Sequence, residues 1–118
     1  MPVTILIADS NAEMRRLTDL ALRLAGYAIL QAADGPGALA LAAAYRPDLI
    51  VADVKLAKLS GIELVARLRV GGDGGPPALL LSGRHRPAAL PARSTFLAKP
   101  FAFDRLQREV AHLLHPIA

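Results

Sequence analysis

Short continuous apolar runs alternate along the chain with amphipathic or small-residue stretches. Five apolar runs have the length of strands covered on both faces: 3–8, 28–32, 49–53, 78–82 and 95–98. Four further stretches have the residue pattern of helices: 11–25, 36–44, 60–70 and 103–114. Strands that alternate with helices in this way predict an α/β fold built from parallel βα units.

Residues with strong local preferences indicate where the helices begin and end. Asn11 is expected to cap the first helix, Gly26 to follow its end, and Pro36 to open the second helix. The first helix is expected to place four apolar residues on one face: Met14, Leu17, Ala21 and Leu24.

The connection between the fourth and fifth strands departs from a regular βα unit. Pro87 and Pro91 lie within residues 83–94 and exclude a long helix, because proline lacks a donor and clashes one turn back. The glycine- and proline-rich loop 71–77 invites a phosphate-binding interpretation. Since it precedes a strand and not a helix, we favour an ordinary loop.

Length and composition favour a single domain over residues 1–118. The chain has 118 residues, 53% of them hydrophobic, which suits one core. The absence of cysteine excludes disulfides and thiolate metal sites and fits a reducing compartment, so a cytoplasmic location is expected. The apolar stretch 38–45 is too short to span a bilayer.

The formal charge of +4 comes from 14 basic and 10 acidic residues, which are scattered and accompanied by only 4% aromatic residues. This pattern favours a solvated surface over a nucleic-acid-binding face. A local surplus of basic residues surrounds the end of the third and fourth strands: Lys55, Lys58, Arg84 and Arg86.

Polar residues lie where predicted strands end. Asp9 follows the first strand, Asp53 ends the third, Ser82 ends the fourth, and Lys99 follows the fifth. In a parallel sheet of strand order 2-1-3-4-5 these four side chains would converge on the carboxyl edge. Ligands of open α/β sheets bind at that edge.

Six short segments, in this order, carry a resemblance: 5–9, Ala33-Asp34-Gly35, 46–53, 60–64, Leu81-Ser82-Gly83 and Lys99-Pro100-Phe101. With them the whole chain resembles the receiver domain of two-component response regulators. The resemblance implies a flavodoxin-like, doubly wound, five-stranded parallel sheet with a shortened or missing fourth helix. It also implies an aspartyl-phosphate switch driven by a histidine kinase.

The resemblance assigns roles to particular residues. Asp53 would be the phosphoacceptor, with a strand-end capping carboxylate as the competing interpretation. Lys99 would pair with a phosphoryl oxygen, although a salt bridge to Asp53 explains it too. Ser82 would donate to the phosphoryl group, or serve only as a turn hydroxyl. Phe96 matches the family's rotating aromatic, with ordinary core packing as the alternative.

The acidic pair that the family usually carries after the first strand is here Asp9-Ser10. Asp9, Asp53 and the Lys55 backbone carbonyl remain as magnesium ligands. Because Mg²⁺ prefers carboxylate oxygens, we expect its binding to be weak or lost. Lys55 would lie near Asp53 and partly replace the metal charge, or simply face solvent.

The expected partners are a histidine kinase or phosphotransfer protein and a downstream protein, with no membrane or nucleic acid involved. The short fourth unit predicts that contacts use helix one, helix five or a non-standard surface. A phosphatase would need an acid where Lys55 stands, so we do not expect an enzyme. The alternative is a phosphorylation-independent pseudo-receiver that acts as a protein-binding module.

Overall fold

The computed structural model describes residues 2–69, 75–83 and 86–116. Its elements follow the chain in this order: β1 (Thr4–Ala8), α1 (Ala12–Leu24), β2 (Ala28–Ala32), α2 (Gly35–Tyr45), β3 (Leu49–Asp53), α3 (Gly61–Leu68), β4 (Ala78–Ser82), β5 (Ser94–Ala98) and α4 (Phe103–Leu114). The predicted α/β alternation is therefore confirmed, and most boundaries agree within one or two residues.

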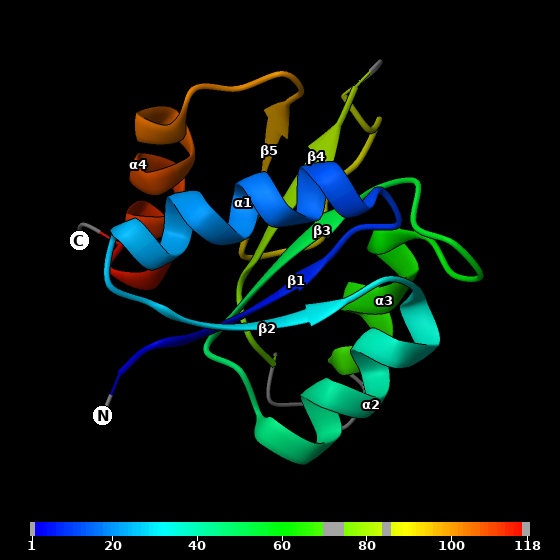
Figure 1. The fold of residues 1–118 in the computed structure, drawn as a ribbon. Coiled ribbons are helices and arrows are strands. Elements are labelled where there is room, and N and C mark those ends of the chain that lie inside the picture. Colours follow the sequence, from blue (N-terminus) through cyan, green and yellow to red (C-terminus); the bar gives the residue numbers. More distant parts are fainter. Residues whose placement is uncertain (1, 70–74, 84–85, 117–118) are drawn as a thin grey trace.

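The five strands form one parallel sheet in the order β2-β1-β3-β4-β5. Helices α1 and α4 cover one face of the sheet, and α2 and α3 cover the other (Figure 1). This is the predicted flavodoxin-like, doubly wound arrangement. Because all strands run in the same direction, their carboxyl ends meet at a single edge.

Alternate residues of each strand supply two separate cores. Ile5 and Ile7 of β1 pack toward α1 and α4, whereas Leu6 and Ala8 pack toward α2 and α3. All four are buried, as the continuous apolar run predicts for a strand covered on both faces.

Capping side chains begin three of the helices. Asn11 Oδ1 accepts from the Met14 backbone N–H at 3.0 Å, Asp34 Oδ1 from Gly37 at 2.7 Å, and Ser60 Oγ from Glu63 at 3.1 Å. Each satisfies a backbone donor that has no partner within its helix. The Gly37 bond is the largest influence on Asp34, whose pKa it lowers.

The buried face of α1 coincides only in part with the face that carries Met14, Leu17, Ala21 and Leu24. The helix buries Thr18, Ala21 and Leu22, whereas Leu17 and Leu24 are 41% and 69% exposed. Thr18 tolerates burial because its hydroxyl donates to the Met14 carbonyl at 2.9 Å. The helix is thus rotated relative to the face that apolar spacing predicted, and the displaced leucines face solvent.

The described part of the connection between β4 and β5, residues 83 and 86–93, contains no helix, as Pro87 and Pro91 predicted. Arg69, at the end of α3, links the end of this segment to the residues just before β4. Its guanidinium donates to the carbonyls of Pro76 at 3.2 Å and Arg93 at 3.4 Å, and also to that of Ala92. Burial and the nearby Arg93 lower the pKa of Arg69. Most of the glycine-rich loop, and Arg84, lie outside the described residues.

Candidate functional site

Two carboxylates and one ammonium group meet at the carboxyl edge of the sheet. Lys99, just after β5, donates from Nζ to Asp9 Oδ2 at 3.1 Å and to Asp53 Oδ2 at 2.9 Å. Asp9 and Asp53 follow or end the neighbouring strands β1 and β3, and Ala8 pairs with Ala52 in the sheet register. The topology therefore places together three residues that are up to 90 positions apart.

The cluster is largely withdrawn from solvent. Asp9 is 1% exposed, and the side chains of Asp53 and Lys99 keep 16% each. Burial acts to lower the pKa of Lys99, but the hydrogen bonds that Lys99 donates to Asp53 and Asp9, together with their negative charges, outweigh it, so its pKa is raised above 10.5. Lys99 is therefore an ammonium at neutral pH, and it reduces the repulsion between the two carboxylates.

Backbone groups orient the carboxylates. Asp9 Oδ1 accepts from the Asn11 N–H at 2.9 Å, and Asp53 Oδ1 accepts from the Lys55 N–H at 3.1 Å. Arg15 supports the same loop by donating from Nη1 to the Asp9 carbonyl at 2.7 Å. Arg15 was not among the predicted site residues. The signal that could have indicated it is an arginine in the first turns of the helix that follows Asp9.

Ser82 is buried at the end of β4, which pairs with β3, the strand that ends at Asp53. Its backbone carbonyl accepts from the Lys99 N–H at 2.9 Å, so the ends of β4 and β5 are held together at the cluster. Phe96 is half-buried in β5, and the Arg86 guanidinium lies 6.0 Å from the centre of its ring.

Ser10, which stands where the family usually has a second acidic residue, makes a hydrogen bond to another loop. Its Oγ accepts from the Ala57 backbone N–H at 2.8 Å, a contact between loops 47 residues apart. The Ala57 carbonyl in turn accepts from the Gly35 N–H at 3.1 Å. Ser10 therefore helps to fix the β3–α3 loop, and the Lys55 side chain of that loop is exposed.

The donor set suits a magnesium ion only in part. Asp9 and Asp53 supply two carboxylates, within the one or two that Mg²⁺ usually takes from protein. Among the described residues, no three His, Cys, Asp or Glu side chains gather into a metal site. Lys99 already contacts both carboxylates, and the Ser10 hydroxyl that follows Asp9 in the chain accepts the Ala57 N–H.

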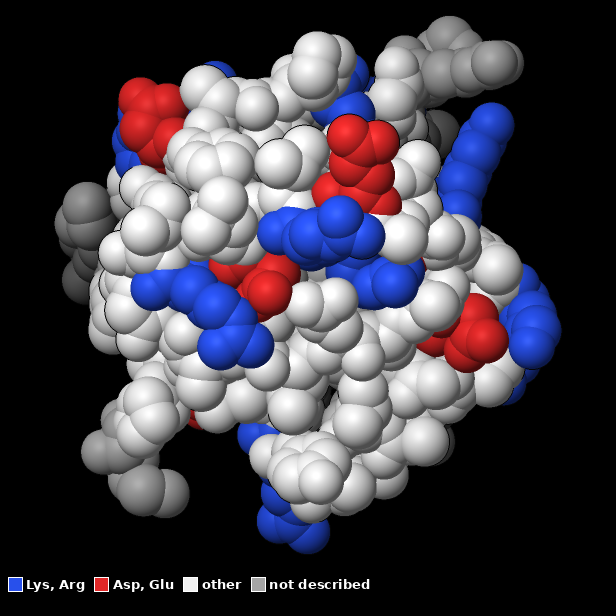
Figure 2. Space-filling model, in the orientation of Figure 1, with Lys and Arg blue, Asp and Glu red and all other residues white. Residues whose placement is uncertain are grey.

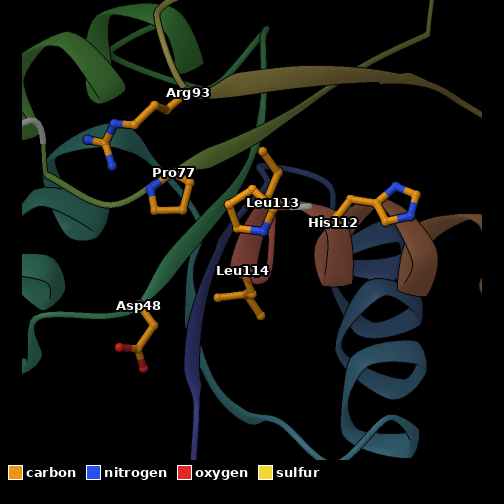
Figure 3. A pocket seen from close by; sticks show the side chains of 7 residues that line it. Asp48, Pro77, Arg93, His112, Leu113 and Leu114 are labelled. Atoms are coloured by element: carbon orange, nitrogen blue, oxygen red, sulfur yellow. The ribbon is translucent and has the colours of Figure 1, made fainter. Parts of the chain in front are cut away.

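A hollow of about 460 Å³ lies at the opposite, amino edge of the sheet. Figure 3 shows Pro77 across from Leu113 and Leu114 of α4, with the side chains of Asp48 and His112 turned away from the two leucines. The Asp48 carboxylate accepts from the Thr4 N–H at 2.8 Å, and no predicted site residue lines the hollow. We therefore place the candidate site at the carboxyl edge.

Charges of both signs share the surface over α1 (Figure 2). Arg23 pairs with Asp19 within this helix at 2.6 Å. This mixed pattern differs from the single-signed basic stripe that nucleic-acid-binding faces carry. No helix in the described ranges has the length and apolar character needed to cross a membrane.

Comparison with known proteins gives consistent matches. Residues 5–111 match the family model of the response regulator receiver domain. The response regulator MprA of Mycolicibacterium vanbaalenii is 39% identical over 119 residues, covering 97% of this chain and 51% of that protein. The chain thus spans about half the length of this relative.

Solved structures agree with these matches. The chemotaxis response regulator CheY4 of Vibrio cholerae superposes with a TM-score of 0.85 at 28% identity, covering 97% of this chain and all of that one. The receiver domain of the hybrid histidine kinase CckA gives a TM-score of 0.80 at 29% identity, covering 95% and 99%. The chain belongs to the response regulator receiver domain family of two-component systems.

Proposed function

We propose that this receiver domain accepts a phosphoryl group on Asp53 from a histidine kinase or phosphotransfer protein. An oxygen of Asp53 would form the new bond to phosphorus while the bond from phosphorus to the donor breaks. The observation that carries the proposal is Lys99 Nζ, 2.9 Å from Asp53 and 3.1 Å from Asp9 in a nearly closed site. A carboxylate is a weak nucleophile, so positioning and charge neutralisation must supply the rate.

The surrounding groups suit that chemistry. Lys99 stays protonated at neutral pH and would pair with a phosphoryl oxygen. The Lys55 N–H, which donates to Asp53 at 3.1 Å, holds the carboxylate in position. Ser82 would donate its hydroxyl to another phosphoryl oxygen, and its shift would be transmitted along β4 and β5 to Phe96.

Receiver domains typically bind Mg²⁺ at their acidic pocket. Here Asp9, Asp53 and the Lys55 carbonyl would hold the ion, which when bound would neutralise phosphoryl charge. We propose that its affinity is low, because Ser10 contributes a neutral oxygen that already accepts the Ala57 N–H at 2.8 Å. The exposed Lys55 ammonium would supply part of the missing positive charge.

Partner contacts are proposed to use α1. Leu17, Leu20 and Leu24 are 41%, 50% and 69% exposed, and their spacing places them on one side of the helix. An exposed apolar stripe on a small domain is typical of a protein-binding surface. The connection between β4 and β5 offers no such helix in its described part, which agrees with contacts made elsewhere.

The test is intact-mass measurement after incubation with acetyl phosphate, with and without magnesium, and with a phosphorylated kinase. Wild type and Asp104→Asn, which changes an exposed carboxylate of α4, should each gain one phosphoryl group. Asp53→Asn should gain none. If wild type gains no phosphoryl group from either donor, the phosphoacceptor proposal fails and the pseudo-receiver function takes its place.

A further inference from the structure

A hollow of about 350 Å³ opens directly beside the candidate site. Two site residues, Ser82 and Lys55, line it together with Arg86. Its volume lies near the lower end of the range for small-molecule pockets, which is the size of a compact organic ligand. A pocket that includes the side chains around the phosphoacceptor is placed to take part of a phosphodonor.

The walls of this hollow are apolar. They come from the β3–α3 loop, the second position of α3 and the start of the helix-free connection: Val54, Ile62, Pro87 and Ala88. Residues 83 and 86–93 form no helix, and among the described residues of this connection Pro87 and Ala88 supply the apolar wall. The departure from a regular βα unit thus leaves an apolar recess next to Ser82.

The rim of the hollow is positive. Lys55 and Arg86 both line it, and no carboxylate from the described part of the chain does. Neither makes an ion pair with an acidic residue of the described ranges. Arg86 is held near the hollow by its position over the Phe96 ring, 6.0 Å from the centre. An apolar cavity with a cationic rim is complementary to a carboxylate that carries an apolar body.

We propose that this hollow receives the leaving group of a small phosphodonor, so that Asp53 prefers acyl phosphates with an apolar acyl group. The inference rests on the proposed phosphoacceptor function. An Asp53 oxygen forms the bond to phosphorus, and the bond from phosphorus to the acyl oxygen breaks. The electron pair leaves with the acyl carboxylate, which faces Lys55 and Arg86, and no proton or further reactant is required.

The expected size of the preference follows from apolar contact. One face of an aromatic acyl group would bury about 60 Å² more than an acetyl group, which at roughly 25 cal/mol per Å² gives about a tenfold faster reaction. The assay is the rate of phosphoryl gain by intact mass with benzoyl phosphate and with acetyl phosphate. Phosphoramidate, whose leaving group is not a carboxylate, provides the reference donor.

Matched variants test whether the hollow causes the preference for the aromatic acyl phosphate. Ala88→Phe fills it, whereas Ala89→Phe changes an exposed neighbour that does not line it. We expect the benzoyl-to-acetyl rate ratio to be about ten in wild type and Ala89→Phe, and to fall to about one in Ala88→Phe. Arg86→Gln should slow both acyl phosphates relative to phosphoramidate, and Arg16→Gln on α1 should not.

The outcomes separate the two proposals. A ratio near one in wild type, or a ratio that Ala88→Phe leaves unchanged, overturns the leaving-group pocket while Asp53 remains the phosphoacceptor. No adduct with any of the three donors or with a phosphorylated kinase overturns both. Near-wild-type circular dichroism and urea midpoints for the two phenylalanine variants would exclude misfolding as the cause of any difference between them.

Discussion

Replacement of Lys99 by methionine removes the only side-chain cation that contacts Asp9 and Asp53 among the described residues. The side-chain volume is nearly retained, so the change is chiefly electrostatic. At 3 Å and an effective dielectric constant of about 20, each contact has a Coulomb energy of about 5 kcal/mol before desolvation is subtracted. Breaking a fully buried pair costs about 3–5 kcal/mol, and partial exposure places this site at the lower end, about 3 kcal/mol.

The predicted loss can be measured by thermal or urea unfolding. A chain of 118 residues has an unfolding entropy of about 0.25 kcal/mol/K, so about 3 kcal/mol lowers Tm by about 12 °C. Lys58→Met is the matched control, because Lys58 pairs with Asp34 at 3.5 Å but its side chain is 70% exposed. Such surface pairs contribute about 0–1 kcal/mol. Lys99→Met with Asp53→Asn should recover part of the loss, because the two carboxylates no longer repel each other.

The pH dependence gives a second check on the same reasoning. The pKa of Lys99 is raised in the folded state, above 10.5. Its stabilisation is therefore fully present below pH 10.5 and is lost as pH rises through the folded-state value. The stability difference between wild type and Lys99→Met should stay constant through neutral pH and shrink only in strong alkali. A Lys99→Met loss equal to that of Lys58→Met, or a difference that disappears near neutrality, would refute the argument.

Three further substitutions test other parts of the structure. Ser10→Asp should raise magnesium affinity by about tenfold, because a carboxylate is a better ligand than a hydroxyl; calorimetric titration against Ser10→Ala would detect it, and equal affinities would contradict the role of Ser10. Gly61→Ala should lower the free energy of unfolding by about 2 kcal/mol or more, since the added Cβ would collide with the Asp53 carbonyl oxygen; an unchanged urea midpoint would count against this close packing. Arg69→Lys should cost about 1–2 kcal/mol, because a lysine cannot reproduce the donation to three carbonyls; Arg67→Lys on exposed α3 surface should cost less than about 0.5 kcal/mol.

The magnesium and partner expectations depend on residues outside the Lys99 cluster. Ser10 contacts Ala57, and the exposed leucines of α1 contact solvent. Membership of the family does not by itself predict either role. Ser10 is a position where this chain departs from the family's pattern, and the exposure of the α1 leucines is known only from the folded structure. They remain predictions for binding measurements.

Local sequence determined the elements and their order. A continuous apolar run such as 49–53 has few alternatives to a buried strand, and a side chain such as Asn11 or Ser60 marks a helix start by supplying an acceptor for a backbone donor. Proline at 87 and 91 excluded a long helix by covalent geometry. The carboxyl-edge position of Asp53 and Lys99 then followed from parallel topology.

Only the tertiary structure decided which contacts join these elements. The buried face of α1 is centred on Thr18 and Leu22 because it depends on how the helix docks on the sheet and on α4, and not on apolar spacing alone. The bond from Ala57 to Ser10 and the link made by Arg69 join residues distant in sequence, so no local pattern signals them. The hollow beside Ser82 likewise exists because separate segments enclose it. Periodicity and capping act within a few residues, whereas packing depends on the shape of every surface that meets.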